Sequence, residues 1–246
     1  MSSEEIAKYF DATEFREVRE DLVFAMNMAS EPKIAIDCGC GAGADIDYLM
    51  RNGFTVYGFD IEQESVSRCQ SRFDGIKNVI LSQSSFSTFN YPQASLVVAD
   101  ASLFFCPRSE FESVWKNIYQ CLQSNGVFCG SFLGHGDTMA EVGDNPSVFW
   151  PEVTAFDEPE VKQLFKNFEL LSFKVHKSRG KTSQGAAHNW HIFQVVAQKP
   201  NKSNHADLNF PRFSGHLLIT QEVANAPIYT TQKNMAIYER FQNKGG

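Results

Sequence analysis

The sequence is short of several features that would assign it to a broad class of protein. It has no apolar run long enough to cross a membrane. Lysine and arginine number 22 against 29 aspartates and glutamates, a formal net charge of −7. This balance is unlike the basic footprint of a general nucleic-acid binder. The first residues, Met1 to Glu5, lack the basic and apolar regions of a signal peptide. We therefore expect a cytoplasmic protein with neither nucleic acid nor membrane as a partner.

Paired cysteines are also lacking. None of the six cysteines forms a C-x-x-C pair, so the sequence contains no zinc framework and we expect no bound metal. Free, buried thiols in a reducing compartment are the simplest interpretation of these residues, which are Cys38, Cys40, Cys69, Cys106, Cys121 and Cys129.

The composition that is present is that of an ordinary globular protein. The 246 residues are 43% hydrophobic and 21% charged, enough to build one large domain with a sizeable core. No internal repeat or low-complexity segment interrupts the chain.

Strand-like and helix-like segments alternate from Lys33 to Lys199. This alternation predicts an α/β fold with a mainly parallel sheet covered by helices on both faces. A polar loop over 177–189 separates the last two strands and favours an antiparallel pair there. The predicted strands are 33–37, 55–60, 78–82, 95–100, 125–133, 168–176 and 190–198, and the predicted helices are 44–52, 62–72, 109–123 and 157–166.

Two further segments flank this region. Residues 1–30 have helical periodicity and could cover a ligand cleft, and Glu31-Pro32 closes them. Arg16 and Arg19 in this segment could reach a carboxylate or could simply line a solvated helix face. Residues 200–246 begin with a polar linker and are expected to pack on the main domain, 31–199, or on a partner subunit.

The chain is organised around a glycine-rich turn that follows the first predicted strand. Asp37 ends this strand, and Gly39, Gly41 and Gly43 follow at every second position before a helix begins. This geometry lets backbone N–H groups and a helix N-terminus approach a ligand closely. Asp60 ends the next strand 17 residues after Gly43, about where an acid that binds a ribose diol is expected.

The order of these residues separates two kinds of nucleotide site. A dinucleotide site would have G-x-G-x-x-G. Here an acid precedes the glycines, and a carboxylate is a poor neighbour for pyrophosphate but a good one for an ammonium group. The stretch resembles the first motif of class I S-adenosylmethionine-dependent methyltransferases. That resemblance implies a Rossmann-like, doubly wound sheet of seven strands with one antiparallel strand. It also implies cofactor contacts from Asp37, Gly39, Cys40, Gly41, Gly43, Asp60 and Ile61.

The same resemblance implies roles for residues after the third and fourth strands. Ser85 and Phe86 stand where relatives have an acid and an apolar residue against the adenine, and the missing acid is a departure from the family pattern. Asp100 stands near the cofactor's ammonium or sulfonium, or else caps the following turn. Arg19, which could reach a carboxylate, is a further candidate for cofactor binding.

Three short segments, 102–107, 130–137 and 188–193, also resemble the tellurite-resistance-like small-molecule methyltransferases. His135 and Asp137 could act as a general base or could lie in an exposed turn. Phe104, Trp150 and His188 are candidate substrate contacts, although Phe104 could equally belong to the core. His188 and His191 would point to opposite faces of a strand, which is a poor arrangement for a shared metal.

The expected function is methyl transfer from S-adenosylmethionine to a small-molecule acceptor, leaving S-adenosylhomocysteine, by a monomer or homodimer. The alternatives are an RNA or protein methyltransferase and a non-catalytic cofactor-binding protein; a dehydrogenase is disfavoured by the glycine spacing.

Overall fold

The computed structural model describes residues 11, 13–140, 153–181 and 187–201. Trp150 and nearly all of the expected C-terminal extension lie outside these described residues, as do residues 1–10. The division into 1–30, 31–199 and 200–246 stays a prediction.

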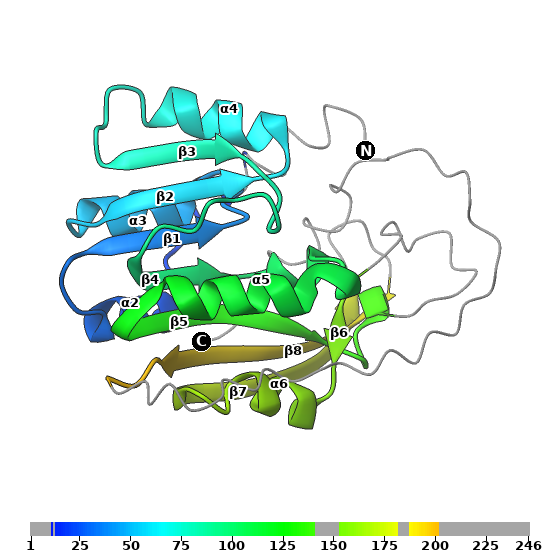
Figure 1. Cartoon of the computed structure of the whole chain (residues 1–246). Coiled ribbons are helices and arrows are strands. Elements are labelled where there is room, and N and C mark those ends of the chain that lie inside the picture. Colours follow the sequence, from blue (N-terminus) through cyan, green and yellow to red (C-terminus); the bar gives the residue numbers. More distant parts are fainter. Residues whose placement is uncertain (1–10, 12, 141–152, 182–186, 202–246) are drawn as a thin grey trace.

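The fold is built on one sheet with the strand order β3-β2-β1-β4-β5-β8-β7. In Figure 1 the strands from β1 to β5 run in one direction and β8 runs back between β5 and β7. The seven strands are β1 (Ile34–Cys38), β2 (Thr55–Asp60), β3 (Val79–Gln83), β4 (Ala94–Ala99), β5 (Leu122–Gly134), β7 (Glu169–Lys181) and β8 (Ala187–Gln198). This confirms the predicted Rossmann-like α/β sheet with one antiparallel strand. A two-residue strand, β6 (Ala155–Phe156), adds to the end of β5.

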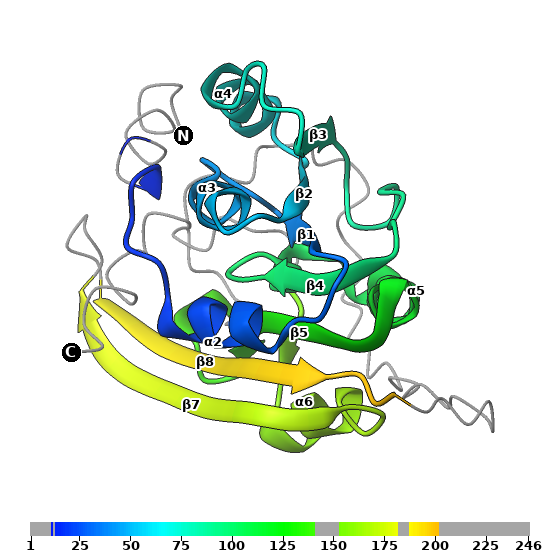
Figure 2. The same ribbon diagram turned by 90° about the vertical axis from the view of Figure 1, so that its left-hand side faces the viewer.

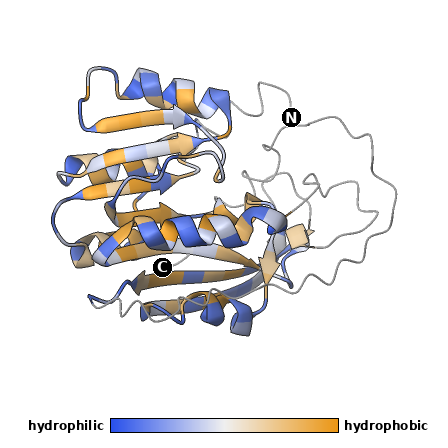
Figure 3. Cartoon of the chain, in the orientation of Figure 1, coloured by the Kyte–Doolittle hydropathy of each residue, from blue (hydrophilic) through white to orange (hydrophobic). Residues whose placement is uncertain are grey.

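Burial explains why the central strands form. Every residue of β4 is buried, and β1 is buried after its first residue. Such continuous apolar runs are typical of parallel strands covered on both faces. Figure 3 shows the contrast, because the central strands are mostly orange whereas α4 and α5 alternate between orange and blue.

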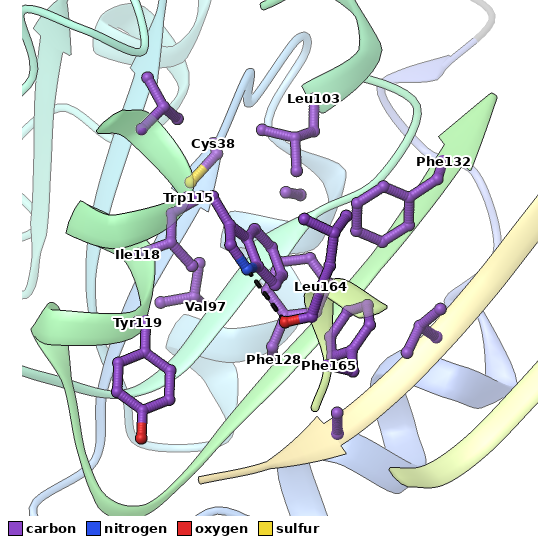
Figure 4. Packing of buried hydrophobic residues seen from close by; sticks show 14 of the residues in the cluster. Cys38, Val97, Leu103, Trp115, Ile118, Tyr119, Phe128, Phe132, Leu164 and Phe165 are labelled. Carbon is purple, nitrogen blue, oxygen red and sulfur yellow. Dashed lines mark hydrogen bonds between the residues drawn. The ribbon is translucent and has the colours of Figure 1, made fainter. Parts of the chain in front are cut away.

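Helices cover both faces of the sheet, as the alternation predicted (Figure 2). One face carries α2 (Glu20–Met28), α3 (Ala44–Arg51) and α4 (Gln63–Arg72), and the other carries α5 (Arg108–Cys121) and α6 (Glu158–Leu164). Trp115 of α5 lies at the centre of the core between the sheet and the helices α5 and α6, where its indole N–H donates to the carbonyl of Leu164 at 3.2 Å (Figure 4). All six cysteines are buried free thiols, as predicted. No helix in the described part of the chain is long and apolar enough to span a membrane.

The N-terminal segment differs from the predicted continuous helix. Among its described residues, 14–19 are not helical, and α2 begins only at Glu20. Leu22 and Ala25 pack α2 against the sheet, so this helix covers the sheet face. The apolar periodicity missed the break because the extended segment is fixed by ion pairs of Arg16 and Arg19 with distant carboxylates.

The last two strands are longer than predicted. The polar residues of the expected loop over 177–189 largely belong to β7 and β8, in which Lys177 pairs with His191 and Arg179 with Asn189. Backbone hydrogen bonds between β7 and β8 hold these residues in strands. The sequence pattern shows only that their side chains are polar, and for that reason it predicted a loop. The strand predicted over 125–133 likewise begins earlier, because β5 starts at Leu122, and Asn125 within it has a positive φ of 62°.

Candidate active site

The glycine turn connects β1 to α3 in a conformation that requires glycine. Gly39, Gly41 and Gly43 have φ values of 73°, 51° and 80°. A Cβ at Gly39 would also lie 2.6 Å from the Cβ of Ser102. L-residues with side chains rarely adopt this backbone region, so the turn depends on these glycines. The N–H groups of Gly39 and Gly43 donate within the protein, to the carbonyls of Phe59 and Cys40 at 2.8 and 2.9 Å, so the glycines shape the turn rather than offer it free donors.

Asp60 supports this turn from the end of β2. Its Oδ2 accepts a hydrogen bond from the Gly41 N–H at 2.9 Å, and its Oδ1 accepts one from the Glu62 N–H at 3.0 Å. Burial raises the pKa of the Asp60 carboxyl, although these backbone donors oppose the shift. A carboxylate has about four acceptor sites. Asp60 can therefore hold the turn and still accept from a diol.

A pocket of about 270 Å³ opens beside Asp60 at the carboxyl ends of β2, β3 and β4. Ile61, whose surface is 55% exposed, and Phe86 provide apolar walls. Ser85 also lines it, but its hydroxyl lies 3.0 Å from that of Thr88 and 3.1 Å from that of Ser87. The structure thus brings together five of the expected cofactor contacts, Gly39, Asp60, Ile61, Ser85 and Phe86, around one pocket, and their role in binding stays a prediction.

The loop after β4 is fixed tightly against the glycine turn. Ala101 has a φ of 50°, and its N–H donates to the Ser131 hydroxyl at 2.8 Å. The Ser102 hydroxyl donates to the Cys38 carbonyl at 2.6 Å. Left-handed backbone at a residue other than glycine is strained and persists where the surroundings impose it, which is common at ligand sites.

A buried group of opposite charges lies beside this loop. Arg16 and Arg19 both contact Oδ2 of Asp45, at 2.8 and 3.0 Å, and Nε of Arg19 lies 3.2 Å from Oδ2 of Asp100. Burial alone would raise the pKa of Asp45, but the two guanidinium groups outweigh it and hold this pKa below its ordinary value. Arg19 stays charged because Asp100 and Asp45 outweigh its desolvation and raise its pKa. Arg19 does reach this site, as expected.

Asp37 adds a third carboxylate to this group. It is 4% exposed, and among the described residues none donates a hydrogen bond to its carboxylate. Burial and then the nearby Asp45 raise its pKa, and Arg16 and Arg19 only partly oppose them. Three carboxylates face two guanidinium groups, so this group has one negative charge in excess when all are ionised. A buried carboxylate without a donor is suited to a cationic ligand.

The loop after β5 has a different arrangement from the one expected. Asp137 is fully buried, and its Oδ1 accepts from the Met139 N–H at 3.0 Å while its Oδ2 accepts from the His191 N–H at 2.8 Å. The His188 Nε2 lies 3.0 Å from the same Oδ1. These contacts tie the loop to β8 and argue against Asp137 as a general base. They correct the expectation of an exposed turn. The His135 side chain is 64% exposed and lies 3.8 Å from Glu160.

The candidate substrate contacts are dispersed. Phe104 is 1% exposed and packs with Leu133, Met139 and Ile192 in a small core, which favours the structural alternative for this residue. His188 is buried against Asp137 and Trp190, with the His188 and Trp190 ring centroids 4.7 Å apart. Within the described part of the chain, neither side chain faces the pocket beside Asp60.

Sequence reasoning missed Asp45, the residue that joins both arginines. Its position in the first turn of α3 is also explained by the helix dipole, so the sequence offers no separate signal for it. Ala101 was missed because its left-handed conformation depends on Ser131 of a neighbouring strand.

Comparison with known proteins agrees with this geometry. Residues 35–126 match the family model described as a methyltransferase domain. The carboxy-S-adenosyl-L-methionine synthase of Actinobacillus pleuropneumoniae serotype 7 (strain AP76) is 28% identical over 170 residues, which are 64% of this chain and 70% of that protein. The synthase of the same name from Haemophilus ducreyi (strain 35000HP) is 26% identical over the same shares.

Solved structures share the fold. TehB from Haemophilus influenzae superposes with a TM-score of 0.62 at 19% identity, covering 79% of this chain and 67% of that one. The 1,6-didemethyltoxoflavin-N1-methyltransferase of Burkholderia thailandensis, solved with 1,6-didemethyltoxoflavin and S-adenosylhomocysteine, gives a TM-score of 0.55 at 17% identity, covering 78% of this chain and 81% of that one.

Proposed function

Because the chain is a class I S-adenosylmethionine-dependent methyltransferase, we propose that it methylates a small-molecule acceptor. The observation that carries this proposal is the buried Asp37 carboxylate, to which no described residue donates. It lies between the glycine turn and the ion pairs that Arg16 and Arg19 form with Asp45. The acidic net charge of −7 favours a small molecule over RNA.

The residues present fit the cofactor. Its adenine suits the apolar walls that Ile61 and Phe86 give the pocket, and Asp60 can accept from the ribose hydroxyls. Its methionine end carries a sulfonium, an ammonium and a carboxylate, one positive charge in excess. The carboxylates and guanidinium groups beside Asp37 have the opposite excess. In this proposal Asp37 accepts from the ammonium and Arg19 attracts the carboxylate.

When bound, S-adenosylmethionine supplies a methyl carbon that is electrophilic because of the adjacent sulfonium. The chain's own contribution is position and electrostatics. Ala101 and Ser102 hold the β4 loop against the glycine turn, so that Asp37 and Asp100 keep fixed positions around the cofactor's charged end. An acceptor that is already a thiolate or an oxyanion needs no base.

A neutral alcohol or amine acceptor needs a group that takes its proton. His135 is our proposal for this role, since its imidazole is accessible at the carboxyl end of β5. Asp137 would then act as a positioning residue for the loop that carries His135, through its hydrogen bonds to β8.

A second candidate follows from the curated relatives, whose name makes carboxy-S-adenosyl-L-methionine their product. Two buried or half-buried guanidinium groups, Arg16 and Arg19, lie at the proposed methionine end, where a further carboxylate could be attracted. In this alternative the cofactor itself is the molecule that is modified.

One experiment separates these functions. The purified protein is titrated calorimetrically with S-adenosylmethionine and S-adenosylhomocysteine, and then incubated with methyl-labelled cofactor and cell extract. We expect binding of both and label in the small-molecule fraction. Label in RNA or protein would contradict the small-molecule acceptor. A cofactor of increased mass, seen by mass spectrometry, would support the second candidate. No binding of either compound would refute the whole proposal.

The proposed reaction takes place in the cytoplasm. Six buried cysteines without a disulfide suit a reducing compartment. The choice between monomer and homodimer stays a prediction.

A further inference from the structure

A second hollow, of about 500 Å³, lies between the ends of β7 and β8 and the glycine loop that follows β5. Lys177 and Arg179 occupy alternate positions of β7, so their side chains leave the same face of the hairpin. Their cross-strand partners, His191 and Asn189, also line the hollow. This hairpin pocket therefore has two cationic side chains beside neutral hydrogen-bonding groups.

No carboxylate lines the hairpin pocket among the described residues. Arg179 is moreover the exception among the seven arginines described by the structure, since the other six form ion pairs. Lys177 likewise has no ion-pair partner in the described part of the chain. In a chain of net charge −7, two neighbouring cations without a carboxylate partner indicate a place for an anion.

His191 supplies a hydrogen-bond donor on the same wall. Its Nδ1 accepts from the Gly136 N–H at 3.1 Å, and burial, followed by the charge of Lys177, lowers its pKa. The neutral ring therefore carries its proton on Nε2. That nitrogen is buried and has no hydrogen-bond partner in the described structure. A buried donor left unsatisfied is unfavourable by roughly 1–3 kcal/mol, so an acceptor that reaches Nε2 would stabilise this site.

The ring of His191 is held in place by glycines. A Cβ at Gly134 would lie 2.4 Å from this ring, and one at Gly136 would lie 3.0 Å from its Nδ1. The absence of side chains at these two positions lets the imidazole pack directly on the loop. The position of the His191 Nε2–H donor is thus fixed by the packing of its ring on the end of β5 and the loop that follows.

The hairpin pocket lies on the same edge of the sheet as the cofactor pocket. Between β4, whose loop lines the cofactor pocket, and β7 stand β5 and β8. At about 4.8 Å per strand, the β4 loop and β7 are roughly 14 Å apart along the sheet. A single small molecule of extended shape can reach from one to the other.

We propose that the hairpin pocket binds the anionic end, a carboxylate or a phosphate, of the acceptor that this enzyme methylates. The inference rests on the proposed function and specifies its substrate class. Lys177 and Arg179 attract and orient the anion, Nε2–H of His191 donates to it, and the atom that receives the methyl group lies at the β4 loop.

The test measures anion binding by the full chain with S-adenosylhomocysteine bound. Inorganic phosphate and acetate are titrated separately and followed by nuclear magnetic resonance, so that the two possible anionic groups are distinguished. We expect one of them to shift the backbone amide signals of β7 and β8 with a millimolar dissociation constant. The double variant Lys177→Gln/Arg179→Gln is expected to bind at least about tenfold more weakly, because it loses two charge-assisted contacts.

The matched control is Arg51→Gln/Lys162→Gln, which removes the same charge from exposed side chains that already have carboxylate partners. It should bind the anion as the unchanged protein does. Arg179→Lys keeps the charge and should retain most of the affinity.

Several outcomes would overturn the inference. These are no binding of either anion by the unchanged protein, and equal binding by the double variant. Binding of a ribo-oligonucleotide alone, abolished by the double substitution, would replace the small molecule with RNA. Failure to bind S-adenosylhomocysteine would instead refute the proposed function, so the two failures are distinguishable.

Discussion

Arg19 and Asp100 meet at the end of β4, with Nε of the arginine 3.2 Å from Oδ2 of the aspartate and both side chains less than a tenth exposed. The arginine precedes the first residue of α2, and the aspartate follows the last residue of β4. This contact therefore joins the N-terminal segment to the loop that borders the proposed methyl-transfer site.

Removing the arginine from this contact should destabilise the fold. In Arg19→Met, Asp100 loses a buried partner and Asp45 keeps only Arg16. Breaking a buried ion pair in this way typically lowers the free energy of unfolding by about 3–5 kcal/mol. Urea denaturation would measure the change. Arg51→Met is the control, since its side chain is 71% exposed, and it should change stability by less than about 1 kcal/mol.

A compensating substitution should recover part of that loss. Arg19→Met/Asp100→Asn carries no charge at the buried position 100, so it should be more stable than Arg19→Met alone. Equal stability of the two variants would show that the charge of Asp100 does not destabilise the fold when Arg19 is absent, and would contradict this prediction.

Asp60→Asn should weaken binding of S-adenosylhomocysteine. The amide cannot accept at both of its heavy atoms, so the variant loses either the Gly41 or the Glu62 backbone contact as well as charge-assisted bonds to the ribose. We expect a loss of about 1–3 kcal/mol in binding free energy by calorimetry. Asp74→Asn on the exposed surface is the matched control and should leave the affinity unchanged.

Cofactor affinity should depend on pH through Asp37. The pKa of its carboxyl is raised in the free protein, and an ammonium binds only the ionised form. Affinity should therefore be highest above this raised pKa and should fall as the pH falls through it, by up to about tenfold per pH unit. Calorimetry over a series of pH values tests this expectation. Asp37→Asn should bind weakly at every pH, and a pH dependence that persists in this variant would assign the effect to another group.

Asp137 and His135 should respond differently to substitution. Asp137→Ala leaves the buried N–H groups of Met139 and His191 without an acceptor, so we expect a loss of about 2–4 kcal/mol in stability by urea denaturation. His135→Ala changes an exposed side chain and should leave stability within about 0.5 kcal/mol. If Asp137→Ala unfolds at the same urea concentration as the unchanged protein, the structural role is wrong.

Features that depend on residues close together in the sequence could be predicted from it, whereas contacts between distant segments could not. The glycine turn and Asp60 were predicted because their signals are local: positive φ demands glycine, and a strand end fixes where a carboxylate lies. The partners of Arg16 and Arg19 were not predicted, because only the packing of α2 on the sheet brings Asp45 and Asp100 to these arginines.

Long-range pairing also explains the residues after β5. Asp137 was expected in an open loop because its neighbours are glycine and polar residues, yet β8 supplies two contacts to its buried carboxylate, from the His188 ring and the His191 N–H. The basic side chains of β7 were assigned to a loop for the same reason. Where a strand pair extends beyond the hydrophobic core, its side chains do not alternate between apolar and polar, so the sequence pattern does not predict a strand there.

The length of β7 has a consequence for association between molecules. This strand has 13 residues and stands at the edge of the sheet among the described strands, with free backbone groups that another strand could pair with. Lys177, Arg179 and Lys181 crowd this edge with positive charge. The repulsion between two such edges opposes head-to-tail or side-by-side polymerisation, so the same basic residues that suit an anion also protect the chain from aggregation.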